Sequence, residues 1–184
     1  MDELNIYSFP KSLKKAREKL TQPPALPVNT QRDALPEGKT GSFRKDEKYP
    51  VFSGPSEGFY RAANGKASVS TNDWIQIFGC ENDMVLIQYA ISSEKSRFGY
   101  IPAEAVKDQS QLEILEPAYL PANILKACSL TDDPLKSKGE VAQFQAGDAV
   151  RYLATFGDSW TYVETLTQPP MRGFVPSAAV VIVE

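Results

Sequence analysis

The sequence "RGFVPSAAV" (172–180) repeats, in altered form, the sequence "RFGYIPAEAV" (97–106). Both contain a glycine, an aromatic residue, a β-branched residue, a proline, a small residue, one more position and then Ala-Val. The glycine permits a tight bend or a close backbone approach. The proline cannot donate a ladder hydrogen bond, so it ends a strand, and the last valine resumes one. The motif therefore predicts the same strand–turn–strand unit twice.

The repeat extends beyond this motif. Residues 74–88 align with 150–164 at an offset of 76, and the offset falls to 74 at Gly99 and Gly173 because the intervening loop is longer in the first copy. Short runs rich in β-branched and aromatic residues surround it, separated by turn residues. They cover 74–78, 84–91, 98–101, 140–144, 149–154, 160–165, 173–175 and 180–183. This texture predicts an all-β fold of two small antiparallel barrels in tandem.

The first 46 residues differ in texture from the rest. The segment "KSLKKAREKL" (11–20) predicts a short helix with Ser12 as its N-cap, and a Pro-rich linker follows. The expected organisation is helix plus linker over 1–46, a first barrel over 47–117 and a second over 118–184. We expect the apolar segment 111–125 to continue the last strand of the first barrel and then form an interface. "PPALP" (23–27) is either a plain spacer or an internal ligand that docks on a barrel of the same chain. The spacer is favoured, because Thr21 and Asn29 stand at the flanking positions where such ligands carry Arg or Lys.

Composition and charge argue against several functions. The net charge is −3, and residues 49–184 alone carry −6, so a broad phosphate-binding surface for nucleic acid is not expected. No apolar run approaches the roughly 20 residues that a membrane helix needs, so no direct membrane insertion is expected. The chain has no histidine, which removes Ser-His-Asp and Cys-His catalysis. We therefore predict no enzymatic activity, no cofactor and no metal.

Cys80 and Cys128 are expected to be free, partly buried thiols rather than a disulfide.

The repeated motif resembles the closing segment of SH3 domains, and the rest of each copy resembles the bacterial SH3-type branch. "YPVFSGPSEGFYR" (49–61) looks like the family's opening strand and turn, and "QAGDAVRYLATFGDSWTYVE" (145–164) looks like its central hairpin. The resemblance covers 48–184. Ala179 and Ala105 stand where a peptide-binding SH3 domain carries its groove tyrosine, so recognition of a proline helix is not expected.

The resemblance implies a non-catalytic binding or targeting module whose partner is a cell-wall component or an envelope protein. It implies an extracytoplasmic or envelope location, while the absence of a signal sequence in the first residues leaves the cytoplasm open. The alternative is a structural or regulatory tandem barrel that mediates protein–protein contacts without a small-molecule ligand. Candidate ligand-binding residues are Tyr60, Arg61, Trp74 and Tyr100.

For the aromatic residues, an opposing interpretation is core packing. It is favoured for Trp74, Tyr89, Trp160, Tyr162 and Phe174, because a small barrel depends on aromatic side chains for buried area. In the corresponding interpretation of the loop, Phe59 or Tyr60 fills the open end of the barrel and Arg61 covers that end.

Overall fold

The structure, a computed structural model, describes residues 34–44, 46–61, 67–107 and 109–183. The described chain is all-β, as predicted, and its helical turns are three short 3₁₀ segments. The expected helix over 11–20 and "PPALP" lie outside the described residues. The strands are β1 Lys39–Thr40, β2 Lys48–Pro50, β3 Ser68–Ser70, β4 Ile75–Glu81, β5 Met84–Ala90, β6 Ser96–Pro102, β7 Leu120–Ile124, β8 Cys128–Thr131, β9 Glu140–Phe144, β10 Ala149–Phe156, β11 Trp160–Thr165, β12 Arg172–Pro176 and β13 Val180–Ile182.

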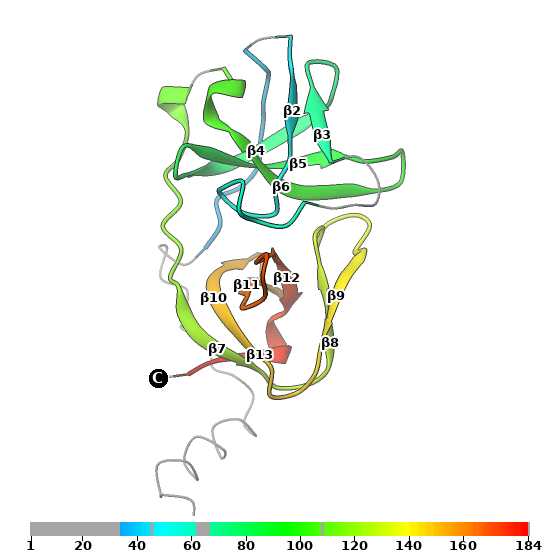
Figure 1. The fold of residues 1–184 in the computed structure, drawn as a ribbon, viewed down its shortest axis with the longest axis vertical. Coiled ribbons are helices and arrows are strands. Elements are labelled where there is room, and N and C mark those ends of the chain that lie inside the picture. The colour runs from blue at the N-terminus through cyan, green and yellow to red at the C-terminus, as the bar shows by residue number, and fades with distance from the viewer. Residues whose placement is uncertain (1–33, 45, 62–66, 108, 184) are drawn as a thin grey trace, which may run out of the picture.

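The strands form three sheets in two stacked halves (Figure 1). The first half has a four-stranded sheet in the order β1-β4-β5-β6 and the two-stranded sheet β2-β3. The second half has one seven-stranded sheet in the order β13-β7-β10-β11-β12-β8-β9. These sheets are open at their edges, so closed barrels are not what the strand pairing shows. All the strands that the sequence predicted are present.

The repeated motif adopts the same backbone in both halves. Pro102 and Pro176 have φ of −55° and −56°, and each precedes a 3₁₀ turn, at Ala103–Ala105 and at Ser177–Ala179. Extended backbone resumes at the valine that closes each turn. The prediction of a strand, a proline-initiated turn and a resumed strand is therefore confirmed in both copies.

The single offset of 76 over residues 74–88 was wrong for the first strand of the hairpin. Ile75 pairs with Tyr89 while Val150 pairs with Thr165, so β4 and β10 are related by 75 positions and β5 and β11 by 76. The reason is the turn length. Two residues with positive φ, Asn82 and Asp83, join β4 to β5, whereas three residues beginning with Gly157 join β10 to β11. Hairpin turns tolerate such changes because their ends stay paired.

A β-bulge interrupts the first strand of each hairpin at equivalent places, between Ile77 and Gly79 and between Tyr152 and Ala154. The extra residues are Phe78 and Leu153, and both are buried in one cluster that contains residues from the two halves. A bulge locally redirects side chains and increases strand twist. Each hairpin therefore turns an additional apolar side chain toward the other half.

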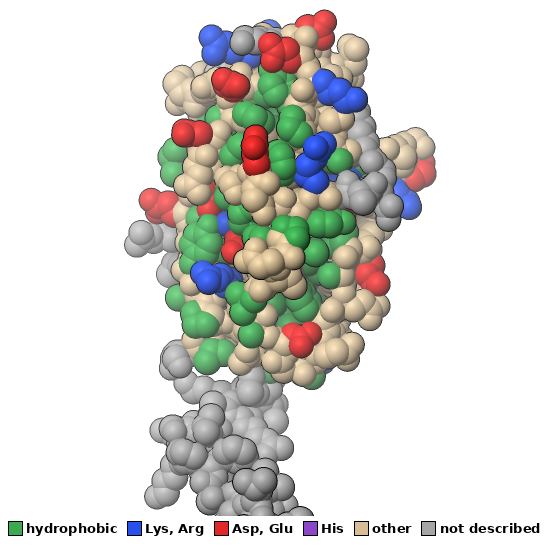
Figure 2. All heavy atoms as spheres, viewed as in Figure 1, with side chains coloured by type: hydrophobic (Ala, Val, Ile, Leu, Met, Phe, Trp, Pro, Cys, Tyr) green, Lys and Arg blue, Asp and Glu red, His purple; other side chains and the backbone are tan. Residues whose placement is uncertain are grey.

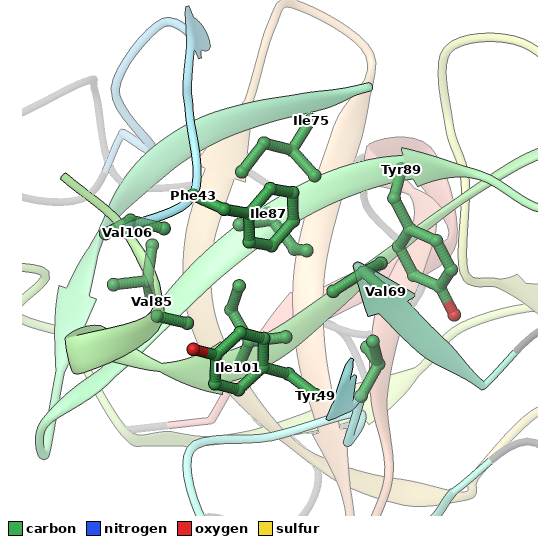
Figure 3. Packing of buried hydrophobic residues seen from close by; sticks show 11 residues of the cluster. Phe43, Tyr49, Val69, Ile75, Val85, Ile87, Tyr89, Ile101 and Val106 are labelled. Atoms are coloured by element: carbon green, nitrogen blue, oxygen red, sulfur yellow. The ribbon is translucent and has the colours of Figure 1, made fainter. Parts of the chain in front are cut away.

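Each half also has a core of its own. The first is built around Val69, Ile87 and Tyr89, with rings and branched aliphatic side chains converging between the strands (Figure 3). The second is built around Tyr152, Val163 and Val175. Tyr89, Tyr162 and Phe174 are buried as expected, but Trp74 is 48% exposed, so core packing is wrong for that residue.

The two halves share a third core. Phe98, Phe156 and Phe174 meet with ring centroids 5.0 to 5.6 Å apart, which is the range of favourable aromatic pairs. Strand β5 is buried on both faces, because one face lies in its own core and the other in the shared core. A strand buried on both faces carries a continuous apolar run rather than an alternating one. This explains "MVLIQYAI" (84–91).

Two further segments connect the halves, one on each side (Figure 1). On one side the segment after the first 3₁₀ turn places Leu115 in the shared core, and the backbone amide of Cys80 donates to the Glu113 carbonyl of this segment at 2.7 Å. The expected interface role of 111–125 is thus seen in its central part. On the other side the β8–β9 loop reaches the first half, and Arg97 pairs with Asp132 at 2.7 Å.

The expected boundary at 46/47 lies inside the first half rather than at its edge. Lys39 and Thr40 pair with β4, and Phe43 is buried in the first core, where it bridges to Val106. In the second half β7 corresponds to residues 39–43 of the first, because it pairs both with the first strand of the hairpin, β10, and with the strand that follows the 3₁₀ turn, β13. Among the described residues no helix is long and apolar enough to cross a membrane.

Candidate functional site

The four candidate residues do not form one site. Tyr60 is half-buried and its amide donates to the Pro170 carbonyl at 2.9 Å. Arg61 lies 5.5 Å over the Phe52 ring and donates to the Ala67 carbonyl at 2.8 Å. These contacts fit the interpretation in which this region covers the end of the first core. Trp74 is exposed and directly precedes β4.

Tyr100, the fourth candidate, is fully buried. Its position on β6 faces the shared core because Leu86, its cross-strand partner, faces the same way. Its side chain nevertheless lines the pocket described in the next paragraph.

A pocket of about 410 Å³ lies where the two halves meet. We call it the junction pocket. Four separate pieces of chain form it: the N-terminal end of the described chain, β6, residues 111–120, which we call the connecting segment, and the β10–β11 hairpin. Its lining residues are Ala34, Leu35, Pro36, Tyr100, Glu113, Ile114, Leu115, Glu116, Pro117, Leu153, Ala154 and Tyr162. Its volume lies within the range of roughly 300–1,000 Å³ typical of small-ligand sites.

The floor of the junction pocket rests on a buried ion network. Arg172 donates to Glu81 at 2.7 Å and to Glu164 at 2.8 Å. The Arg172 and Glu81 side chains are only 1% and 7% exposed. Arg172 also donates to the Tyr100 hydroxyl at 3.2 Å. Because Glu81 lies on β4 and Arg172 on β12, this network joins the two halves directly behind the pocket.

Burial keeps the pocket tyrosines protonated. Loss of hydration raises the pKa of Tyr162 to about 12, although Arg172 nearby acts to lower it. Burial likewise raises the pKa of Tyr100 well above its usual range. Burial alone would lower the pKa of Arg172, but the tyrosine oxygens and Glu81 reverse this and raise it. At neutral pH the site therefore holds a charged guanidinium and neutral phenols.

Sequence reasoning missed Arg172, although a signal was present. At the offset of 74 it aligns with Phe98, a buried interface residue. A charge at a position that is apolar in the other copy is expected only where a partner neutralises it. The partner could not be identified from sequence, because Glu81 is 91 residues away.

Other reactive groups in the described part of the chain are sparse. No group of three or more Cys, Asp or Glu side chains there is placed to hold a metal ion. Cys80 and Cys128 are free and half-buried, as expected. Burial raises the pKa of both thiols, and Asp83 raises that of Cys80 further. In Figure 2 the Lys and Arg side chains of the visible face are scattered singly rather than gathered in a patch.

No protein-family model matches the chain, and no curated protein matches it. Solved structures that resemble it include NlpC2 from Trichomonas vaginalis, at 12% identity and a TM-score of 0.33, and NlpC1 from the same organism, at 13% identity and a TM-score of 0.32. The matches cover 80% and 86% of this chain and 49% and 51% of those chains. The chain thus spans about half the length of these structures, and similarity this low carries no argument about fold or function.

Proposed function

We propose that the chain is a non-catalytic binding and targeting module of two SH3-like barrels in tandem, whose partner is a peptidoglycan-related cell-envelope component or an envelope protein. The repeated hairpin, the repeated proline-initiated turn and the strand that pairs with both the hairpin and the last strand support the tandem SH3-like architecture. The strand pairing is open, so the barrels of this proposal are partly open ones.

The observation that carries a binding role is the junction pocket. It has the volume of a ligand site, and its walls belong to both halves. Because the halves share a core and a buried ion network, the walls are held in a fixed arrangement before any ligand arrives. A pre-formed site lowers the entropy lost on binding. The envelope as the place of action rests on the resemblance to bacterial SH3-type domains, which also implies an extracytoplasmic location.

The test is co-sedimentation of the full chain with insoluble peptidoglycan at low and moderate salt. The informative variant is Ile114→Ser, because Ile114 lines the junction pocket and is 73% exposed, so its loss leaves the cores intact. Leu166→Ser is the matched control, since Leu166 is 56% exposed on a loop of the second half outside the pocket lining. Tyr60→Ala and Arg61→Ala test the candidates read from sequence.

We expect the wild-type chain and Leu166→Ser to be retained with the wall, and Ile114→Ser to be retained less. Retention that depends instead on Tyr60 or Arg61 would move the site to the end of the first core. A wild-type chain that stays in the supernatant would contradict direct wall recognition.

The alternative is a structural or regulatory tandem barrel that contacts another protein and binds no small molecule. The observation that favours it is the exposed apolar side chains along the connecting segment, Ile114, Tyr119 and Leu120, at 73%, 42% and 38% exposure. Contiguous exposed apolar surface marks interaction sites. No wall retention, together with cross-linking of a protein partner that Ile114→Ser abolishes, would favour this alternative.

A further inference from the structure

We propose that the junction pocket recognises a cationic peptide segment, in which a Lys or Arg side chain enters the pocket and apolar neighbours lie along the connecting segment. This inference rests on the proposed binding function and specifies the chemistry of its ligand.

The first argument is the charge of the pocket. Glu113 and Glu116 line it, and no basic residue does among the described lining residues. Behind the floor, two carboxylates, Glu81 and Glu164, face the single guanidinium of Arg172, so the buried network carries a net negative charge. A concave site with low-dielectric walls concentrates such a field and attracts ligands of the opposite charge.

The cation that pairs with Glu113 is not fixed in the pocket. Lys39 pairs with Glu113 at 3.3 Å, and the two side chains are 71% and 52% exposed. Exposed pairs of this kind contribute about 0–1 kcal/mol, so an incoming cation competes with Lys39 at little cost. This arrangement leaves the Glu113 carboxylate available to a ligand.

The second argument is the shape and polarity of the walls. Leu115, Leu153 and Ala154 are buried apolar residues, and Tyr100 and Tyr162 add aromatic surface. Long cationic side chains bury their aliphatic stems against apolar surface while the charged head stays near carboxylates. Aromatic rings add an attraction for cations. A carboxylate rim over an apolar and aromatic interior therefore fits a Lys or Arg side chain better than an anion or a neutral polar group.

The third argument favours a peptide over an isolated amine. The exposed apolar side chains continue from the pocket along the chain, from Ile114 to Tyr119 and Leu120. This surface extends beyond what one side chain covers. A segment with leucine-like neighbours on either side of its cation would bury it, which supplies the hydrophobic part of the affinity.

The test measures binding of two synthetic peptides to the full chain by calorimetry. One is acetyl-Ala-Leu-Lys-Leu-Ala-amide, and the other is the same peptide with the lysine acetylated on Nζ. The two peptides differ only in the charge and the acetyl group. We expect the charged peptide to bind at least about tenfold more tightly at low salt, and the difference to shrink as salt screens the carboxylates.

Glu113→Gln and Glu116→Gln are the informative variants, and each should weaken binding of the charged peptide about three- to tenfold. Both residues are exposed, so the fold should tolerate the changes. Glu94→Gln is the matched control, because Glu94 is an exposed carboxylate in the β5–β6 loop outside the pocket lining. Equal binding of the two peptides, absence of binding, or unchanged affinity in both pocket variants would overturn the inference.

The outcomes separate this inference from the proposed function. Wall retention with no preference for the charged peptide would refute the cationic ligand and leave the wall-binding role standing. Selective binding of the charged peptide without wall retention would support the cationic site and redirect the function toward protein partners.

Discussion

Glycine stands at positions 99 and 173 because another segment of the chain lies directly over each. A Cβ at Gly99 would lie 2.3 Å from the Val51 side chain, and one at Gly173 would lie 2.7 Å from the Thr131 carbonyl oxygen. Both distances are far shorter than van der Waals contact, and the second involves backbone, which cannot rotate away. The repeated glycine is thus required because another segment of the chain approaches closely in both copies.

We therefore expect Gly99→Ala and Gly173→Ala each to lower the free energy of unfolding by about 1–3 kcal/mol, the usual cost of overpacking. Gly139→Ala is the control, because nothing lies within 4 Å of the added Cβ there. Urea denaturation measures all three. A Gly173→Ala variant as stable as Gly139→Ala would show that the strands are not in close contact.

A second prediction at the residue scale concerns Asp133, which is fully buried in the loop that reaches the first half. Its carboxylate accepts hydrogen bonds from the Ser137 amide at 2.6 Å, from the Ser96 hydroxyl at 2.8 Å and from the Leu135 amide at 3.0 Å. Burial acts to raise the pKa of this carboxyl, but the donors outweigh it and lower the pKa. The charged form is therefore favoured by folding.

Asp133→Asn should cost about 2–3 kcal/mol at neutral pH, because amide hydrogens would replace an acceptor that faces several donors. The folded pKa lies below the unfolded value of about 3.9, so the carboxylate stabilises the fold above that pH and its contribution is lost as pH falls through the folded pKa. The stability difference between wild type and variant should thus narrow below about pH 4. Asp158→Asn, in an exposed turn, is the control. A difference that stays constant down to pH 2 would contradict this.

At the scale of elements, the strands were predictable and their partners across the junction were not. Runs of β-branched and aromatic residues, closed by turn residues, identify β4, β5, β10 and β11 from sequence. The unbroken run "MVLIQYAI" also carried the information that β5 is buried on both faces. It did not identify which surface covers the second face, because that surface includes Leu153 and Phe174 from the distant half.

The candidate site was predictable only in fragments. Tyr100 was singled out for its type, but its neighbours Tyr162, Glu113 and Leu35 come from segments that only the folded chain brings together. No local spacing pattern records such a meeting. The glycine–proline motif was predictable because its proline and the 3₁₀ turn that follows are adjacent in the sequence.

The buried ion pair between Glu81 on β4 and Arg172 on β12 links the sheets of the two halves. Glu81→Gln should cost about 3–5 kcal/mol, because it leaves a buried guanidinium without one of its two carboxylates. The double variant Glu81→Gln/Arg172→Met should be more stable than the sum of the two single losses predicts, since the charges of Glu81 and Arg172 are removed together and only the partly exposed Glu164 loses its partner. A double-mutant cycle by chemical denaturation measures the coupling. Additive losses would show that the two residues do not interact, and Glu113→Gln, which removes only an exposed pair, should cost less than about 1 kcal/mol.

At the scale of the whole molecule, the shared core makes the two halves one folding unit. Phe98 of the first half packs on Phe156 and Phe174 of the second. Backbone hydrogen bonds from the Tyr60 amide to the Pro170 carbonyl and from the Leu35 amide to the Thr155 carbonyl also cross the junction. A half on its own would therefore expose much of its interior. Single domains with a continuous core unfold in one cooperative transition. We expect this chain to unfold in one cooperative transition although its sequence contains two copies of the repeat.

The chain carries a natural probe for each half, since its two tryptophans are Trp74 in the first and Trp160 in the second. Trp160→Phe leaves only the first probe and Trp74→Phe only the second, and the urea transitions of these two variants should coincide. Val163→Ala, a change of about 2 kcal/mol in the second core, should then shift both transitions equally, and so should Ile87→Ala at the equivalent position of the first core. If Val163→Ala moved only the Trp160 signal, the halves would unfold independently, and the junction pocket would lack the rigid walls on which its binding role depends.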